Sequence, residues 1–154
     1  MKSDGLYRVF GANGPIGFFD QFNHAKPQLL ITCRGATFGA VNISEANSWI
    51  TGNAMVVRPK DDRLLRDFVE FYFRGAVNLE AVTTGAAQPQ ITRQSLAPVF
   101  VPVPQLSEQK RIVDLLRSVQ QHSHGLQSHY RAKLADLDAL RQALLQKAFA
   151  GELC

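Results

Sequence analysis

Polar and basic residues in loops are the side chains of this sequence that could do chemistry. They gather in two glycine-rich stretches, GANGPIGFFD and RGATFG, and in the later stretch TGAAQPQITRQ. Arginine and lysine match phosphates and guanine edges, and asparagine and glutamine match adenine edges in the DNA major groove. Each residue alone is typical of solvated surface, so the prediction rests on their grouping. The predicted nucleic-acid contacts are Asn13, Asn23, Lys26, Arg34, Thr37, Gln88, Gln90, Thr92 and Arg93.

The residue patterns of common catalytic and cofactor sites are missing from the sequence. There is no GxSxG nucleophile turn and no GxxxxGK[ST] phosphate loop, and Gly11, Gly14 and Gly17 do not form the GxGxxG of dinucleotide folds. His24 is the only histidine before Pro104, and we interpret it as a hydrogen-bonded loop residue rather than a base. The Asn-Pro-Pro-Tyr motif of DNA amino-methyltransferases does not occur. The sequence therefore predicts no catalytic residue, no metal and no cofactor.

Composition limits the chain to one domain with an appendage. The 154 residues carry a formal net charge of +4, which is compatible with a polyanionic partner. Ten basic and eight acidic residues occur up to Pro104, and seven and five follow it, so both parts share the excess. The sequence has no apolar run of about 18 residues and no apolar signal-peptide core. Two widely separated cysteines, Cys33 and Cys154, favour a reducing compartment, and we expect a cytoplasmic protein.

Short strand-like runs separated by Gly, Asn and Pro dominate the first hundred residues. The expected strands cover residues 6–10, 29–33, 40–43 and 54–58. One helix is expected over 61–74, capped by Asp61 or Asp62, and the run 98–103 predicts an edge strand or connector because it contains prolines. We therefore expect a β-rich domain with long loops that ends near Pro104. The expected domains are 1–104 and 105–154.

Helical periodicity dominates the chain after Pro104. Ser107 can cap a first helix, and the segment His122–Gly125 predicts a break whose histidines lie in an exposed turn. A second helix of about 25 residues, or roughly 37 Å, then ends at Gly151. Its apolar stripe is typical either of a terminal helix packed on its own domain or of a coiled-coil arm. The stripe comprises Leu126, Tyr130, Leu134, Leu137, Leu140, Leu144, Leu145 and Phe149.

Several motifs occur in a fixed order from about Tyr7 to Leu153. They are the loop GANGPIGFFDQFNHAKPQLLITCRGATFGAVN, then SWITGNAMVV, TGAAQPQITRQSLAPVFVPVP, the junction PQLSEQKRIV and the tail KLADLDALRQALLQKAFAGEL. In this order they resemble the DNA specificity subunits of type I restriction–modification systems. The junction is similar to the P-x-L-x-E-Q-x-x-I-V of that family, and the tail is similar to its conserved spacer helix.

The resemblance implies an α+β chain with two parts. The β-rich part would be a target recognition domain that binds one half of a bipartite site in double-stranded DNA. The C-terminal helical coiled-coil arm would be a spacer that docks DNA adenine methyltransferase subunits, with the restriction and translocation subunit as a further partner. Methylation with S-adenosylmethionine and ATP-dependent cleavage would belong to those partners, so the chain itself would be no enzyme.

The chain departs from the family pattern in two ways. A full specificity subunit carries two recognition domains and two helical regions, whereas this sequence has one of each and lacks an apolar segment before its first strands. We therefore expect a half-length subunit that forms a homodimer through its C-terminal helices and binds a palindromic, interrupted site. A natural half-subunit, a shuffled cassette and a truncated reading frame all fit this pattern. The alternative is an interaction protein that acts only through its helices and does not bind DNA.

Overall fold

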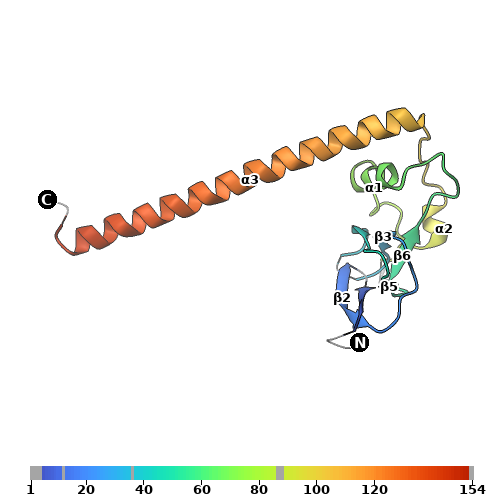
Figure 1. Cartoon of the computed structure of the whole chain (residues 1–154), viewed down its shortest axis with the longest axis horizontal. Coiled ribbons are helices and arrows are strands. Elements are labelled where there is room, and N and C mark those ends of the chain that lie inside the picture. Colours follow the sequence, from blue (N-terminus) through green and yellow to red (C-terminus); the bar gives the residue numbers. More distant parts are fainter. Residues whose placement is uncertain (1–4, 12, 36, 86–88, 153–154) are drawn as a thin grey trace. The chain divides into compact units, whose positions relative to one another are not determined.

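A computed structural model of the chain describes residues 5–11, 13–35, 37–85 and 89–152 (Figure 1). A β-rich part comes first and a long helix follows it, which confirms the predicted α+β class. The elements in chain order are β1 (Tyr7–Gly11), β2 (Gly14–Phe19), β3 (Leu29–Thr32), β4 (Val41–Ile43), β5 (Trp49–Ile50), β6 (Ala54–Val57), α1 (Arg66–Gly75), α2 (Arg93–Leu96) and α3 (Leu106–Phe149).

The first sheet has the strand order β2-β1-β5. β1 and β2 form an antiparallel hairpin whose pairing reaches Gly11 and Gly14, and β5 pairs in parallel with β1 opposite Val9 and Phe10. The stretch that contains β2 was predicted as a glycine-rich turn, and this prediction is wrong. Glycine weakens the local strand signal, while β1 supplies the hydrogen-bonding partners that make the stretch a strand.

The second sheet has the order β4-β3-β6 and is antiparallel throughout. All four residues of its central strand, β3, are buried. Leu30, on the opposite face of β3 from its neighbours, packs with Phe10 and Ile50 of the first sheet. The other face of β3 packs against α1 and later loops in the main core. The buried members of that core are Leu29, Ile31, Val41, Val69, Phe73, Leu79 and Ile91.

Helix α1 begins later than the sequence predicts. It starts at Arg66, and its N-cap position is Leu65, which makes no side-chain cap hydrogen bond. The prediction that Asp61 or Asp62 caps it is therefore wrong. Asp61 instead accepts hydrogen bonds from the backbone N–H and the guanidinium of Arg63. Such a local turn competes with helix formation.

A short helix, α2, occupies part of a stretch that was predicted as loop. The Thr92 hydroxyl accepts a hydrogen bond from the Ser95 backbone N–H, and the Ser95 hydroxyl accepts one from the Thr92 backbone N–H. This reciprocal capping box stabilises a helix of only four residues. The following run, 98–103, contains no strand. Of the two predicted alternatives, an edge strand or a connector, it is therefore the connector.

Helix α3 is uninterrupted over 44 residues (Figure 1), or about 66 Å at 1.5 Å per residue. The predicted break at His122–Gly125 is therefore wrong. A glycine inside a helix costs only about 1 kcal/mol relative to alanine, and good helix formers follow Gly125 as far as Phe149. The helix begins at Leu106, so Ser107 lies within its first turn.

The chain divides into two compact units, Met1–Val113 and Asp114–Cys154. The first two turns of α3 therefore belong to the first unit, and the rest of the helix forms the second. The predicted division into domains 1–104 and 105–154 stays a prediction. Within the described ranges, no helix combines the length and the apolar character needed to cross a membrane.

Candidate nucleic-acid interface

Arg34 and Thr37 lie in the loop that joins β3 to β4. The backbone N–H of Gly39 donates to the Thr32 carbonyl at 2.9 Å and closes this loop. Gly35 and Gly39 have φ values of 93° and 78°, which residues with a Cβ rarely adopt. The two glycines therefore allow a tight turn that leaves the side chains of Arg34 and Thr37 exposed.

A second segment with predicted contacts lies beside the end of β3. The backbone N–H of Ile91 donates to the Cys33 carbonyl at 2.9 Å, so Gln90 and Arg93 come close to the β3–β4 loop. The Thr92 hydroxyl is engaged in the α2 cap, which gives it a structural role. Arg93 is exposed in the first turn of α2. Two distant stretches of the sequence thus form one group of loops.

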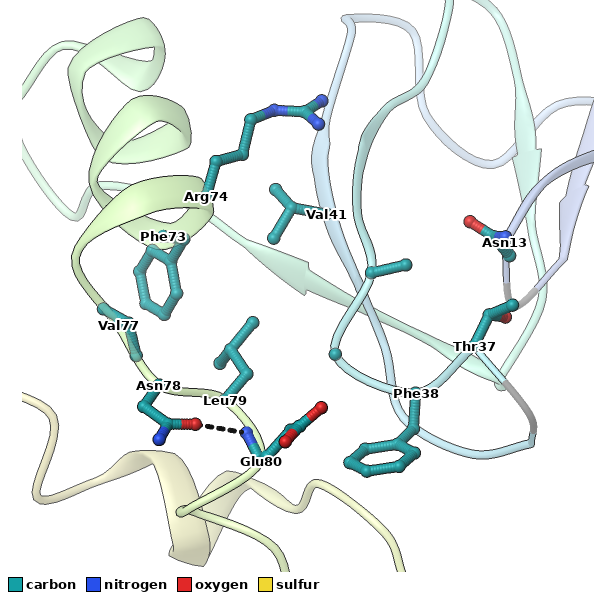
Figure 2. Close-up of a pocket in the computed structure, with 12 residues that line it drawn as sticks. Asn13, Thr37, Phe38, Val41, Phe73, Arg74, Val77, Asn78, Leu79 and Glu80 are labelled. Atoms are coloured by element: carbon teal, nitrogen blue, oxygen red, sulfur yellow. Dashed lines mark hydrogen bonds between the residues drawn. The ribbon is translucent and has the colours of Figure 1, made fainter.

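A hollow of about 570 Å³ opens next to the β3–β4 loop. Figure 2 shows that Asn13, Thr37 and Arg74 border it. The Oδ1 atom of Asn78 accepts a hydrogen bond from the Glu80 backbone N–H at 3.1 Å on another side (Figure 2). The hollow therefore brings together two predicted contacts from separate loops. Its apolar wall includes Val41, Phe73, Val77 and Leu79.

Asn13 is held by a partner that sequence reasoning missed. Its Oδ1 accepts a hydrogen bond at 3.0 Å from Nδ2 of Asn42, a residue of β4 that lies opposite Leu30 in the ladder. Asn42 appears in the sequence only as a polar residue in a strand, and no local pattern links it to position 13. The structure joins them because the hairpin tip lies beside β4.

The remaining predicted contacts lie at the other end of β3. Asn23 and Lys26 precede the strand, whereas Arg34 and Thr37 follow it. Nδ2 of Asn23 donates to the Ile50 carbonyl at 3.0 Å, and Oδ1 accepts from the Ile50 N–H at 2.8 Å. Asn23 therefore acts as a partner for the edge of β5, which is a structural role. Lys26 is exposed.

Arg58 is a cation near this second group that was not among the predicted contacts. β6 pairs antiparallel with β3, with Val57 opposite Leu29, so Arg58 lies near the start of β3. Burial and, secondly, the positive charge of Arg58 lower the pKa of His24. Nδ1 of His24 also lies 2.7 Å from Oδ1 of Asn23, which confirms the interpretation of His24 as a hydrogen-bonded loop residue.

Exposed cations in these loops differ from those elsewhere in the first unit. Four arginines form salt bridges with neighbouring carboxylates, namely Arg8, Arg63, Arg66 and Arg74. In the part of the unit that the structure describes, no salt bridge is found for Lys26, Arg34, Arg58, Lys60 or Arg93. Their positive charge is therefore not neutralised locally and can attract phosphate groups. Gln88, the ninth predicted contact, lies outside the described residues.

Cys33 is a buried free cysteine directly after β3. Burial raises the pKa of the Cys33 thiol, and a protonated thiol is a poor nucleophile and a poor metal ligand. Among the residues with described positions, no group of three His, Cys, Asp or Glu side chains could hold a metal ion.

The predicted spacer-helix residues all lie on α3 and are exposed in the single chain. Leu134 and Leu137, for example, are 62% and 61% exposed. A continuous apolar stripe of this kind is a common mark of a protein–protein interface. The exposed members are Leu126, Tyr130, Leu134, Leu137, Leu140, Leu144, Leu145 and Phe149.

Gln109 is a structural residue that sequence reasoning placed only in the first turn of a helix. Its side chain is 0% exposed. Oε1 accepts from the Leu65 backbone N–H at 2.8 Å, and Nε2 donates to the carbonyls of Arg63 and Pro104 at 2.7 and 2.8 Å. These bonds connect the start of α3 to the start of α1. The sequence offered one signal of this burial. Gln109 lies four residues before Val113, so the two side chains share a helix face.

The chain combines exposed basic loops on an α+β unit with a long helix whose leucine face is exposed. The sequence model of the type I restriction modification DNA specificity domain matches residues 2–134. The chain belongs to this family, which confirms the resemblance inferred from the motifs. The family consists of DNA-recognition subunits without catalysis of their own. Among curated proteins, none matches the sequence.

Three solved structures share the fold. One, described as the structural basis of complex assembly and conformational transition of the type I R-M system, has a TM-score of 0.77 and is 27% identical. The HsdS subunit from Thermoanaerobacter tengcongensis has a TM-score of 0.64 and is 26% identical. The S subunit of the type I restriction-modification system from M. genitalium has a TM-score of 0.67 and is 20% identical, and this match supports only the similarity of the fold. The matches cover 97–99% of this chain but 40% of each other chain, so this chain spans less than half of their length.

Proposed function

We propose that this chain binds DNA sequence-specifically as a specificity subunit of a type I restriction–modification system, with its first unit contacting one half of a bipartite site. The observation that carries this proposal is the set of exposed, unneutralised cations on loops at both ends of β3, in a chain of this family. A single DNA-binding module buries about 600–1,000 Å², which is wide enough to include both ends of a four-residue strand.

We also propose that α3 pairs with a second apolar helix, which another copy of the chain supplies. The apolar positions 126, 130, 134, 137, 140, 144 and 148 follow steps of 4, 4, 3, 3, 4 and 4. This spacing reads the same in both directions from Leu137. An antiparallel pair with its two-fold axis at Leu137 would set Leu126 against Ala148 and Tyr130 against Leu144, as an isologous interface requires. The DNA site would then be an interrupted palindrome whose gap depends on α3.

The chemical steps would belong to other subunits. Methyl transfer to adenine would be carried out by methyltransferase subunits docked on the helical part, and ATP-dependent cleavage by a restriction and translocation subunit. The support for this assignment is the missing catalytic motifs of the sequence together with the role of the family. In this proposal the chain selects the DNA site and positions its partners on it, and the partners catalyse the reactions.

Selection from a randomised duplex pool, followed by fluorescence anisotropy on the selected site, tests DNA binding. We expect the wild-type chain to select a motif, and Arg34→Ala or Arg93→Ala to weaken binding. If the arginine contacts a phosphate, its loss should weaken affinity equally for all sequences and lower the slope of log affinity against log salt concentration by about 1. If it contacts a base, its loss should relax the sequence preference at one position of the motif. Arg63→Ala removes the same charge from a side chain already paired with Asp61 and serves as the control. A wild-type chain that selects no motif would contradict the proposal.

An interaction protein without DNA binding is the second candidate. It is favoured by one observation, namely that the exposed stripe on α3 is sufficient for binding a partner helix whether or not the loops contact DNA. Normal helix pairing combined with no sequence selection from the duplex pool would support this candidate over the first.

A further inference from the structure

Asn13 is held through both its backbone and its side chain. Its backbone lies next to the last pair of the β1–β2 ladder, Gly11 with Gly14, and its Oδ1 accepts the 3.0 Å hydrogen bond from Nδ2 of Asn42. Asn42 is itself anchored, because it pairs with buried Leu30 in the β4–β3 ladder. Asn13 is exposed and borders the hollow beside the β3–β4 loop. An exposed side chain held in this way is preorganised for binding.

The hydrogen bond from Asn42 also decides which end of the Asn13 amide is available. An asparagine amide has one acceptor oxygen and one NH₂ donor group, and an unrestrained amide can turn either end outward. Oδ1 of Asn13 faces Asn42, so the NH₂ group is the end of the amide that faces away from Asn42. In the major groove a donor matches O6 and N7 of guanine, N7 of adenine and O4 of thymine. Cytosine presents only its NH₂ group there, so it is the base that a donor does not match.

We infer that Asn42 is a positioning residue that holds Asn13 as a hydrogen-bond donor, so that Asn13 discriminates against cytosine at one position of the DNA half-site. The inference rests on the proposed DNA-binding function and adds to it a specificity-determining pair. The expectation from sequence matched asparagine to adenine edges, whereas this inference assigns Asn13 a donor role that only cytosine cannot satisfy.

Asn42→Asp is the variant that tests this inference most sharply. A carboxylate can only accept, so Asn13 would turn its NH₂ group toward position 42 and its oxygen outward. The outward acceptor would then match the NH₂ group of adenine or cytosine. Selection from a randomised duplex pool should show that the one position from which the wild type excludes cytosine comes to accept cytosine and to disfavour guanine and thymine, by about tenfold in relative affinity. All other positions of the motif should stay the same.

Three further variants complete the experiment. Asn42→Ala and Asn13→Ala should each remove the preference at that same position, because the amide is unrestrained in one and missing in the other. Asn47→Asp is the charge-matched control, since Asn47 is an exposed loop residue with φ of 53°, a conformation that aspartate tolerates. It adds the same charge without touching Asn13. Circular dichroism melts would establish that each variant is folded.

The outcomes separate this inference from the proposed function. A wild-type chain that selects no motif would overturn both. A wild-type motif that Asn42→Asp leaves unchanged at every position would overturn only the role of Asn42. A loss at all positions in Asn42→Asp, matched by Asn47→Asp, would show a general charge effect and would likewise overturn the positioning role.

Discussion

The two units of this chain treat their apolar side chains in opposite ways. In the first unit, β3 is buried at all of its positions and packs against α1 on one face and the first sheet on the other. Along the second unit every described residue from 119 to 152 is exposed, including the leucine stripe. The first unit therefore satisfies its hydrophobic pattern within one chain. The helix carries an equally clear apolar pattern that stays exposed along the second unit, as the proposed pairing with a second helix requires.

Removal of a leucine at the centre of the stripe should have the largest effect. In the proposed pair Leu137 lies on the two-fold axis, so Leu137→Ala takes away one buried leucine from each copy, at about 2–5 kcal/mol each. Sedimentation equilibrium should show a shift from dimer to monomer. Gln146→Ala is the matched control, because nine residues are two and a half turns and place Gln146 on the opposite helix face. A wild-type chain that stays monomeric at high micromolar concentration would refute the pairing.

Loss of Gln109 should destabilise the first unit and leave the rest of α3 helical. Gln109→Ala leaves the Leu65 N–H and the carbonyls of Arg63 and Pro104 without their partner. A buried unsatisfied polar group costs about 1–3 kcal/mol, so we expect a loss of about 3 kcal/mol in the free energy of unfolding. Trp49, the only tryptophan, is in β5, so urea titration followed by its fluorescence reports on this unit.

Gln120→Ala is the control for that experiment, since Gln120 lies on the same helix and is exposed. It should change the urea midpoint by less than about 0.5 kcal/mol in equivalent free energy. Equal effects of the two substitutions on the free energy of unfolding would mean that the hydrogen bonds of buried Gln109 do not stabilise the first unit. The contrast between buried and exposed positions on α3 would then have no energetic consequence.

The capping box of α2 should contribute less. Thr92→Ala removes the acceptor for the Ser95 N–H, and loss of such a cap typically costs about 1 kcal/mol. Since α2 presents Arg93, the same variant should also weaken DNA binding more than its effect on stability alone explains. Ser95→Ala and the double variant form a cycle with it, and the two effects should be non-additive because both residues serve one motif. Strict additivity would contradict a reciprocal box.

The smallest expected effect is a pH dependence from His24. Burial and the charge of Arg58 lower the pKa of His24 in the folded chain, whereas in the unfolded chain the pKa of a histidine is about 6.5. The unfolded state then binds the proton more readily, so stability should fall as the pH drops below about 6.5 and stay level above it. Urea midpoints at pH 5.5 and 7.5 should differ less in His24→Gln than in the wild type. An unchanged difference would exclude His24 as the cause.

Local sequence patterns predicted the parts of the fold whose signal is periodic. The runs at 29–33, 40–43 and 54–58 contain the strands β3, β4 and β6, because strand-forming residues are dense there. The patterns failed where pairing depends on distant residues. β2 is rich in glycine and β5 has only two residues, and each becomes a strand because β1 offers hydrogen-bonding partners on both of its edges. Such partners cannot be found within a local window.

The candidate site shows the same division. Residue types and loop positions indicated Arg34 and Arg93, and the structure brings their segments together through the bond from Ile91 to Cys33. The same reasoning could not distinguish Asn23, whose amide pairs with the Ile50 backbone. An asparagine in a loop has the same local pattern whether it serves DNA or a neighbouring strand. Only the partner across the fold decides its role.

By itself the sequence determined that the chain after Pro104 is helical, that it carries a leucine stripe and which family it belongs to, since a regular apolar period and ordered motifs are properties of the linear chain. Tertiary structure alone decided that Gln109 is buried, that Asn42 holds Asn13, and that the predicted contacts divide between the two ends of β3. The physical reason is that burial and hydrogen-bond partners depend on contacts between residues far apart in the chain, as with the 29 residues that separate Asn13 from Asn42.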